Sequence, residues 1–285
     1  MIQIPLSYNY IAVFLTLACN LKCSYCINRF GKYIPEKNKL TGKQWIKALN
    51  KIQTTDLPIT LQGGEPTLHP DFYSIVNGIY GAINIDLLTN GKFDTKKFME
   101  NVPPNRMKRN SPYASIRISY HPEQNDITLF FLEVKTLLDR GYSVGIWGVN
   151  HPLYKRSLDI VRGICRELNI DFRTKEFLGE YKNKLYGTYK YEGACEKKFK
   201  RNVFCRTSEL IIGPDGSVYR CHADLYESRM PISNITNDNF RIEDVFRYCS
   251  EFGHCNPCDV KIKTNRFQEY GHTSVIIEEE KCKYK

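Results

Sequence analysis

Three cysteines near the N-terminus, Cys19, Cys23 and Cys26, are spaced closely enough to bind one metal centre. They follow directly on a β-prone apolar stretch, residues 10–17, so their thiols gather on the loop that leaves this predicted strand. A four-iron cluster held by only three thiolates keeps one iron open for a small chelating ligand. A zinc site short of one ligand and a plain cysteine-rich loop are the alternatives that the spacing leaves open.

Four cysteines in the C-terminal third form a second candidate metal centre. Cys205 is followed after ten residues by Gly216 and after four more by Cys221, and Cys255 and Cys258 form a tight Cys-x-x-Cys pair. Two cysteine pairs around a hairpin are the usual pattern of a zinc ribbon, which these residues alone would favour.

The chain has eleven cysteines, an odd number. No secretory signal precedes the first strand, and clustered cysteines in a cytosolic protein more often bind metal or carry redox chemistry than form disulfides. Cys165 is expected to be a small buried hydrophobic residue. Cys195, Cys249 and Cys282 could form a third, incompletely ligated cluster, donate a hydrogen atom, or be buried in the same way.

The segments between the cysteine clusters alternate between strand and helix patterns. Strands are predicted over residues 10–17, 59–62, 83–88, 115–119, 143–149 and 170–176. Helices are predicted over residues 42–52, 72–80, 95–100, 126–139 and 155–168. This order predicts an α/β protein with parallel strands and right-handed crossovers, either an open sheet or, as we expect, a partial (β/α)6 TIM-like barrel. Functional residues should then lie at the C-terminal ends of the strands.

From about residue 180 the pattern changes to short strands, turns and cysteines. Pro214-Asp215-Gly216 between two β-prone runs predicts a hairpin. We therefore expect a domain boundary between residues 180 and 195. It separates the barrel, residues 1–180, from a small cysteine-rich domain of hairpin plus helix, residues 181–285.

The composition of the 285 residues, 42% hydrophobic and 25% charged, excludes a disordered chain. No stretch approaches the roughly 20 apolar residues of a membrane span, so we expect a cytoplasmic protein with no membrane partner. The 41 Lys and Arg against 31 Asp and Glu give a net charge of +10. This charge admits nucleic acid, nucleotides, phosphorylated sugars or an acidic partner protein, although a solvated surface accounts for most of the scattered lysines.

The motif Cys19-x-x-x-Cys23-x-x-Cys26 resembles that of the radical S-adenosylmethionine (SAM) superfamily. Residues 63–67, Gly-Gly-Glu-Pro-Thr, match its GGEP motif at the end of the second strand, and Thr-Asn-Gly at 89–91 agrees after the third. The resemblance covers residues 10–176. It implies a [4Fe-4S] cluster whose open iron binds SAM, and reductive cleavage of SAM to a 5′-deoxyadenosyl radical that abstracts hydrogen from substrate. A flavodoxin- or ferredoxin-type protein would donate the electron.

The resemblance also implies SAM contacts at particular positions. The backbone of Gly63, Gly64 and Glu65 would receive the amino group of SAM, at a strand end where glycine permits close approach. Tyr25 stands at the aromatic position whose backbone meets adenine. Ser119 stands at the polar position near the ribose or the carboxylate.

Two more positions come from the fifth strand. Ile146 stands at the apolar position that packs on adenine, and Asn150 ends the strand; a core aliphatic and a turn residue are the alternatives. Phe131 stands where relatives with an auxiliary domain often have an arginine for the carboxylate of SAM. Another residue, such as His121, would take that role, or the role is absent.

With these N-terminal motifs, the C-terminal cysteines resemble the twitch domain, the shortened form of the SPASM auxiliary domain. In that domain the positions of Cys205, Cys221, Cys255 and Cys258 hold a second [4Fe-4S] cluster. The shortening is visible here because no further cysteine follows the tight pair until Cys282.

Side-chain alternation predicts a polar lining inside the barrel. Arg117 shares a face with Ser119 and therefore points inward, where it either pairs with a carboxylate, the more favoured outcome, or meets an anionic substrate group. Arg173 and Lys175 share a face of the sixth strand and, with Gln62 and His121, complete the expected lining. Such groups favour a substrate with phosphate or carboxylate.

The sequence thus predicts a radical SAM enzyme that abstracts hydrogen from an anionic small molecule, sugar or nucleotide. Oxidation is favoured, as an alcohol dehydrogenation or a cross-link with the auxiliary cluster accepting an electron, over epimerisation. A peptide-modifying enzyme is the alternative, disfavoured because the first strand begins by Tyr10 with no leader-binding module before it. A zinc-stabilised, basic nucleic-acid-binding protein is the third hypothesis.

Overall fold

The computed structural model describes residues 1–28, 39–53, 56–124, 126–263 and 271–279. Its main sheet has nine strands in the order β14-β13-β12-β2-β4-β5-β6-β7-β8. The six strands from β2 to β8 are parallel to their neighbours, as predicted. They are β2 (Tyr10–Thr16), β4 (Ile59–Gly63), β5 (Ile85–Thr89), β6 (Ile116–Tyr120), β7 (Val144–Asn150) and β8 (Asp171–Glu176).

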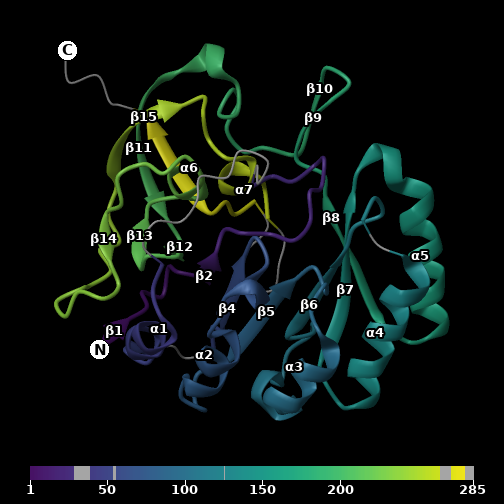
Figure 1. Cartoon of the computed structure of the whole chain (residues 1–285). Coiled ribbons are helices and arrows are strands. Elements are labelled where there is room, and N and C mark those ends of the chain that lie inside the picture. Colours follow the sequence, from purple (N-terminus) through teal and green to yellow (C-terminus); the bar gives the residue numbers. More distant parts are fainter. Residues whose placement is uncertain (29–38, 54–55, 125, 264–270, 280–285) are drawn as a thin grey trace, which may run out of the picture.

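The crossover helices lie along one side of this sheet (Figure 1). They are α1 (Gly42–Leu49), α2 (Phe72–Gly78), α3 (Thr95–Asn101), α4 (Ile127–Asp139) and α5 (Lys155–Glu167). Their starts are set by side-chain caps: Thr41 and Gln44 form a capping box on α1, and Asp94 and Asp126 accept backbone N–H bonds at the starts of α3 and α4. Every predicted strand and helix bound agrees within three residues.

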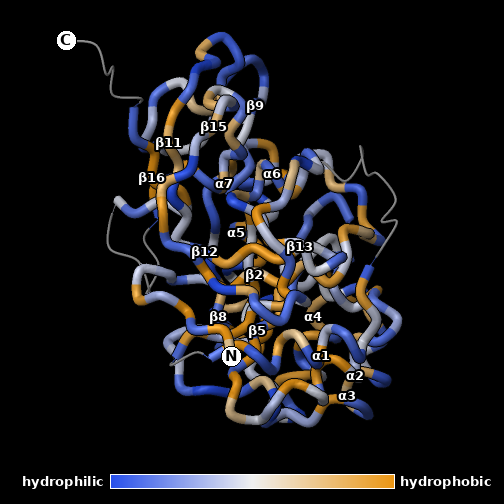
Figure 2. Tube along the Cα trace, turned by 90° about the vertical axis from the view of Figure 1, so that its left-hand side faces the viewer, coloured by the Kyte–Doolittle hydropathy of each residue, from blue (hydrophilic) through white to orange (hydrophobic). Residues whose placement is uncertain are grey.

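The main core lies between these helices and the sheet. Trp45, Phe72 and Phe98 from the helices are fully buried against Leu15 and Leu61 of the strands. Hydrophobic segments concentrate in Figure 2 where β2 and β5 lie beside the N-terminal helices. The opposite side of the sheet, called here the inner face, carries more polar side chains.

Part of the C-terminal region joins the main sheet, while the division expected between residues 180 and 195 stays a prediction. Strand β12 (Glu209–Ile212) pairs in parallel with β2, and the predicted hairpin continues the same sheet through β13 (Ser217–Tyr219) and β14 (Ser233–Asn234). The sheet is therefore mixed. Ala12 and Phe14 on the inner face of β2 pack against Ile211 and Leu225, so a small core joins the two parts.

A second, three-stranded sheet carries two of the C-terminal cysteines, Cys205 and Cys249. Its strands are β11 (Arg201–Thr207), β15 (Arg247–Phe252) and β16 (Val275–Glu279), in the antiparallel order β15-β11-β16. Two short helices pack beside it, α6 (His222–Tyr226) and α7 (Pro257–Val260). The remaining elements are the pair β1 (Ile2–Gln3) and β3 (Ile52–Gln53), the hairpin β9 (Gly179–Tyr181) and β10 (Lys184–Tyr186), and the 3-10 turns Pro66–Leu68, Pro104–Met107, Pro152–Tyr154 and Lys197–Phe199. Within the described residues, no helix is long and apolar enough to cross a membrane.

Candidate functional site

The loop that follows β2 holds Cys19, Cys23 and Cys26 at the C-terminal end of the parallel strands. All three side chains are partly buried. The Cys26 N–H donates a hydrogen bond to the Cys23 carbonyl oxygen, with 3.1 Å between nitrogen and oxygen, and closes a tight turn. The Cys19 sulfur accepts hydrogen bonds from the Leu21 N–H, at 3.4 Å, and from Asn90 Nδ2, at 3.7 Å. Asn90 follows β5, so the Thr-Asn-Gly motif reaches the cysteine loop directly.

The three thiols interact electrostatically, as expected of ligands to a common cationic centre. Burial, together with the like charges of Cys26, Glu123 and Cys19, raises the pKa of the Cys23 thiol to about 12. Bound iron would reverse this balance, because a coordinating thiol binds as the thiolate and releases its proton to solvent.

The residue types and positions of these cysteines fit a cluster held by three thiolates. In the part of the chain that the structure describes, no three His, Cys, Asp or Glu side chains surround one point closely enough for a single metal ion. A four-iron cluster differs from such a site, since each thiolate binds a different iron.

Gly63 and Gly64 are required sterically where β4 ends against the cysteine loop. A Cβ on Gly63 would lie 2.0 Å from the Thr16 carbonyl oxygen, and one on Gly64 would lie 2.1 Å from the Ala18 carbonyl oxygen. The Gly64 N–H donates to Thr16 O at 3.0 Å, and the Glu65 N–H donates to Ala18 O at 2.8 Å. The glycines therefore let the backbone of the GGEP motif lie directly on the chain that leads to Cys19.

The Glu65 carboxylate joins the ends of β4 and β5. It is fully buried and accepts hydrogen bonds from Thr67 Oγ1 at 2.7 Å, Thr89 Oγ1 at 2.8 Å and the Asn90 N–H at 2.8 Å. Burial raises the pKa of this carboxyl group, while these donors oppose the rise. The side chain thus positions Asn90, the partner of Cys19, and the SAM contact predicted for Glu65 could be made only by its backbone.

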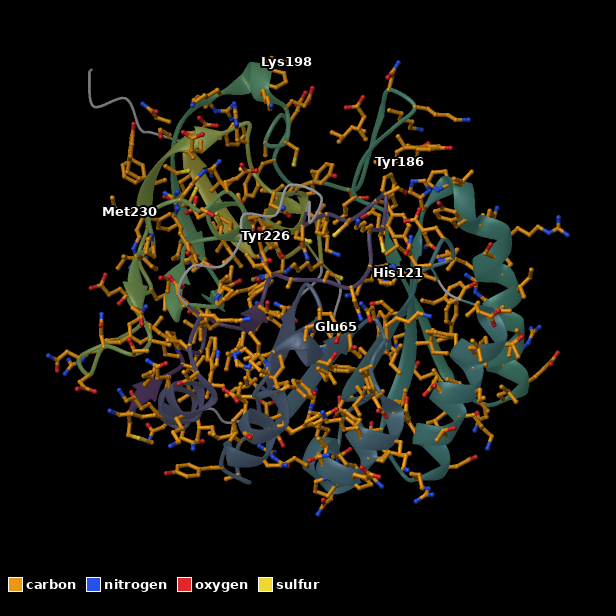
Figure 3. All side chains as sticks on the ribbon, in the orientation of Figure 1. Glu65, His121, Tyr186, Lys198, Tyr226 and Met230 are labelled. Carbon is orange, nitrogen blue, oxygen red and sulfur yellow. The ribbon has the colours of Figure 1, made fainter. Side chains whose placement is uncertain are left out.

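Tyr25 and His121 form an aromatic cluster beside the cysteine loop. The Tyr25 hydroxyl lies 3.0 Å from His121 Nδ1, and burial lowers the pKa of His121 to about 4, so its ring is neutral near pH 7. Glu123 accepts from the Ser24 N–H at 2.6 Å and from the Tyr154 hydroxyl at 3.1 Å. Glu65 and His121 lie at the same end of the parallel strands (Figure 3). This cluster fixes the loop around the third cysteine.

The strand register separates the predicted SAM contacts on β6 and β7. Ser119 pairs with Trp147, whereas Ile146 pairs with Ile118. Ile118 and Ile146 belong to the main core on the helix side, where Gly148, two residues on, faces Leu158 of α5. Ile146 therefore does not reach the inner face, which corrects its expected packing on adenine; Trp147 lies there instead. Phe131 is also in the main core.

Asn150, at the exposed end of β7, donates to Thr174 Oγ1 at 3.2 Å. This contact joins the end of β7 to β8.

Arg117 points to the inner face and pairs with a buried carboxylate, the favoured outcome. Its Nη2 lies 3.0 Å from Asp86 Oδ2 on β5, and Asp86 also binds Arg109 through Nε and Nη2, both at 3.0 Å. The Nε of Arg117 has no hydrogen-bond partner among the described residues, nor has Nε2 of Gln62 on β4. Two buried donors on the inner face are thus left for a ligand.

We expect Asp86→Asn to destabilise the protein by about 3–5 kcal/mol, because it leaves two largely buried guanidinium groups without a counter-charge. Urea unfolding of this variant measures the loss. Asp171→Asn is the matched control, since Asp171 pairs with the more exposed Arg173 and should cost less than about 1 kcal/mol. Equal losses in the two variants would contradict the role given to Asp86.

The other two predicted lining residues on β8 differ in their partners. Arg173 is held by Asp171, 3.0 Å away, and by the Pro112 carbonyl, and it lies over the Trp147 ring. Part of Lys175 is accessible to solvent, but many protein atoms surround its ammonium group. This burial, with the like charges of Arg117 and Lys261, lowers the pKa of the ammonium group to about 8. Lys175 is therefore mostly protonated at pH 7 and can bind an anion.

The lowered pKa of Lys175 predicts how its acylation depends on pH. Only the neutral amine reacts, so labelling of the peptide that contains Lys175 should reach half its maximal rate near pH 8. Peptide mass spectrometry after short exposure to an acylating reagent measures this profile. A midpoint near the ordinary lysine value of 10.5 would show that Lys175 is not enclosed by cations.

Three of the four predicted auxiliary ligands, Cys205, Cys221 and Cys255, line one small cavity in the C-terminal region. Cys258 is not among its lining residues, whereas Cys249 is. Cys165 is buried in α5, as expected, and Cys195 packs at the edge of the C-terminal core. Cys282 lies outside the described residues.

The fold is that of an α/β protein with a mixed sheet, and comparison with known proteins agrees with the N-terminal motifs. A solved structure described as native anSMEcpe with bound AdoMet and Kp18Cys peptide superposes with a TM-score of 0.55 at 17% identity, over 83% of this chain and 78% of that one. Residues 13–109 match the model of the Radical SAM superfamily. This match agrees with the resemblance predicted from the sequence, over a stretch that holds all three cysteines of the loop and the GGEP motif.

Curated relatives match the same part of the chain. The S-adenosylmethionine-dependent nucleotide dehydratase of Selenomonas ruminantium is 38% identical over 80 residues, 27% of this chain and 28% of the relative. The sporulation killing factor maturation protein SkfB of Bacillus subtilis (strain 168) is 38% identical over 79 residues, 27% of this chain and 19% of the relative. The matched stretch thus spans less than a third of the length of these relatives.

Proposed function

We propose that this protein is a radical SAM enzyme that oxidises an anionic small molecule, with a second iron–sulfur cluster in its C-terminal region. The observation that carries the proposal is the meeting of three strand ends at the cysteine loop. Asn90 binds the Cys19 sulfur, and the GGEP backbone binds Thr16 and Ala18 just before it. When bound, a cluster with an open iron holds SAM and supplies the electron for its cleavage.

The chain's own residues would hold these groups in place. Cys19, Cys23 and Cys26 would ligate the first cluster, and the backbone at Gly63 and Gly64 would lie along the amino group of SAM. Ser119 on the inner face of β6 remains the proposed contact to its ribose or carboxylate.

An anionic substrate fits the charges of the inner face. Lys175 has Arg117, Lys261 and Lys263 within electrostatic range, and Arg117 and Gln62 each keep an unpaired donor. A buried donor without a partner costs free energy that a phosphate or carboxylate oxygen would recover. The inner face therefore favours a nucleotide or sugar phosphate, and the relative named as a nucleotide dehydratase supports the same class.

A peptide substrate is the second candidate, supported by the relative named as a maturation protein. The test incubates anaerobically reconstituted protein with SAM, a reductant and separate pools of nucleotides, sugar phosphates and peptides. We expect 5′-deoxyadenosine formation to rise with a nucleotide or sugar phosphate pool. A rise only with peptides would favour the second candidate, and protein that holds zinc but no iron would contradict both.

The net charge of +10 suits docking of an acidic electron donor of the flavodoxin or ferredoxin type. We infer that such a donor reduces the clusters, and reduction should weaken as salt rises, because exposed charge pairs are screened.

A further inference from the structure

Four cysteines from four separate elements line one cavity in the C-terminal region. Cys205 lies in β11, Cys221 caps the start of α6, Cys249 lies in β15 and Cys255 precedes α7. Four thiols around one space are the donor set of a [4Fe-4S] cluster, which Cys residues alone can hold.

Cys249 contacts Cys205 because of the strand register. Cys249 pairs with Val203 in the β11–β15 ladder, and Cys205 lies two residues further along β11, so both side chains are on the same face of the ladder. The two thiol groups are hydrogen-bonded to each other. Cys249 and Cys205 are both in the C-terminal core, with Cys221 and Cys255 packed against it.

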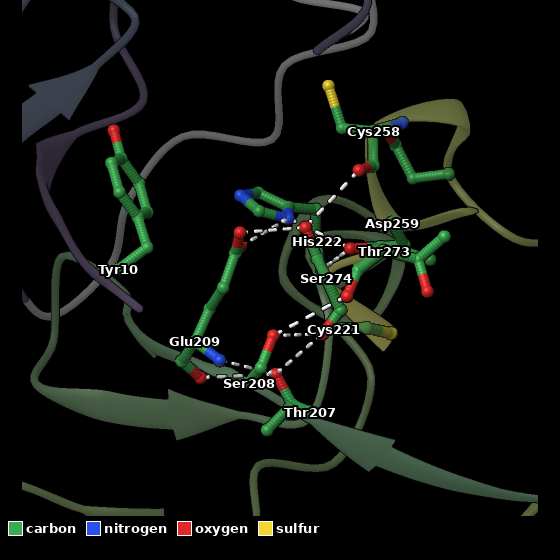
Figure 4. A network of polar contacts seen from close by, with 12 residues as sticks. Tyr10, Thr207, Ser208, Glu209, Cys221, His222, Cys258, Asp259, Thr273 and Ser274 are labelled. Atoms are coloured by element: carbon green, nitrogen blue, oxygen red, sulfur yellow. Dashed lines mark hydrogen bonds and ion pairs between the residues drawn. The ribbon is translucent and has the colours of Figure 1, made fainter. Parts of the chain in front are cut away.

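Cys258 lies on the other side of a buried polar network. Figure 4 shows its sulfur pointing away from that of Cys221, with His222 and Asp259 between them. The Asp259 carboxylate accepts from the His222 and Ala223 N–H groups, both at 3.0 Å, and fixes α7 against the start of α6. The charged neighbours of Cys258 include Lys175 of β8, Lys261 and Lys263, so this thiol lies on the side of α7 toward β8.

The cavity is lined by two arginines and by two carboxylates, Glu251 and Asp259. Arg220 and Arg229 both line it, held by Asp224 at 2.8 Å and 3.1 Å. Arg220 also donates to the Tyr248 carbonyl, 2.6 Å away and next to Cys249 in the chain.

The geometry points to Cys249, and not Cys258, as the fourth ligand of the second four-iron cluster, together with Cys205, Cys221 and Cys255. This inference rests on the second cluster of the proposed function. It leaves the Cys258 thiol unligated on the side of the C-terminal region that faces the inner face of the sheet.

The test removes the first cluster and counts iron at the second. In full-length protein carrying Cys19→Ala, Cys23→Ala and Cys26→Ala, anaerobic reconstitution should give on the order of four irons per chain. Adding Cys249→Ala should abolish the four-iron content and the visible absorbance of the cluster. Adding Cys258→Ala, the matched control, should leave both unchanged.

Each outcome separates the inference from the proposal on which it rests. No iron in the triple variant would contradict the second cluster itself, whereas iron lost with Cys258→Ala, or kept with Cys249→Ala, would overturn the ligand assignment alone. The same two substitutions in the otherwise unchanged chain give a second measurement if the triple variant fails to fold. There the iron content should fall from about eight to about four with Cys249→Ala and stay near eight with Cys258→Ala.

Discussion

Cys23→Ala is expected to abolish formation of 5′-deoxyadenosine from SAM, down to the level of a reaction without protein. The loop offers three thiols, and losing one leaves too few ligands to hold a four-iron cluster with a single open iron. Chromatography and mass spectrometry of the anaerobic reaction measure the product directly.

Cys165→Ala is the matched control for this prediction. Cys165 is buried in α5 against the main core, so the same chemical change should leave cleavage of SAM intact and affect stability only. Equal product from the Cys23→Ala variant and the unchanged protein would contradict the ligand assignment.

Gly64→Ala is expected to produce the second large effect, loss of SAM cleavage with a loss of stability of about 1–3 kcal/mol. The new Cβ would lie 2.1 Å from the Ala18 carbonyl oxygen and 2.5 Å from that of Leu17. Because both obstacles are backbone atoms, the chain leading to Cys19 must move. Thermal unfolding and the product assay measure the two parts of the effect.

Gly163→Ala makes the same substitution where there is room. A Cβ on Gly163 in α5 meets no atom within 4 Å, and alanine is favoured over glycine in a helix by about 1 kcal/mol. This variant should be slightly more stable and fully active. A Gly64→Ala variant that behaves like it would show that the close approach of β4 to the loop is not needed.

The order of the parallel strands and helices could be predicted from the sequence because each element has its own hydrophobic periodicity and is bounded by capping or turn residues. The runs around Ile11, Ile59 and Ile116 are apolar where the strand is buried on the helix side, and α4 shows its start through Asp126. The register between strands is a different matter. A shift of one residue moves a side chain to the other face, and the observed register pairs Ile146 with Ile118 of the main core and Trp147 with Ser119.

The remaining site residues depend on contacts between distant segments, which a single sequence does not reveal. Cys249 stands alone in the chain, and only the pairing of β11 with β15 brings it to Cys205. The tight pair Cys255 and Cys258 predicts two ligands, whereas the cavity lining, which includes Cys249 and Cys255 but not Cys258, led us to propose Cys249 in place of the second. Asp86 could have been found by side-chain alternation, since it is the acidic residue of β5 and Arg117 needed a partner.

The parallel pairing of β12 with β2 also had no signal in the local pattern. The residues Pro214-Asp215-Gly216 predict the turn of the hairpin. They do not predict that its first strand, β12, pairs with β2. Burial of Ile211 and Leu225 against Phe14 favours this pairing.

Electron paramagnetic resonance of the reduced first cluster, with and without SAM, tests the central claim most directly. The protein should carry Cys205→Ala, Cys221→Ala and Cys255→Ala so that only the loop of Cys19, Cys23 and Cys26 contributes a signal. We predict a four-iron spectrum that changes when SAM is added, because SAM occupies the iron that the protein leaves open. A loop that binds no iron, or a cluster spectrum indifferent to SAM, would contradict the account.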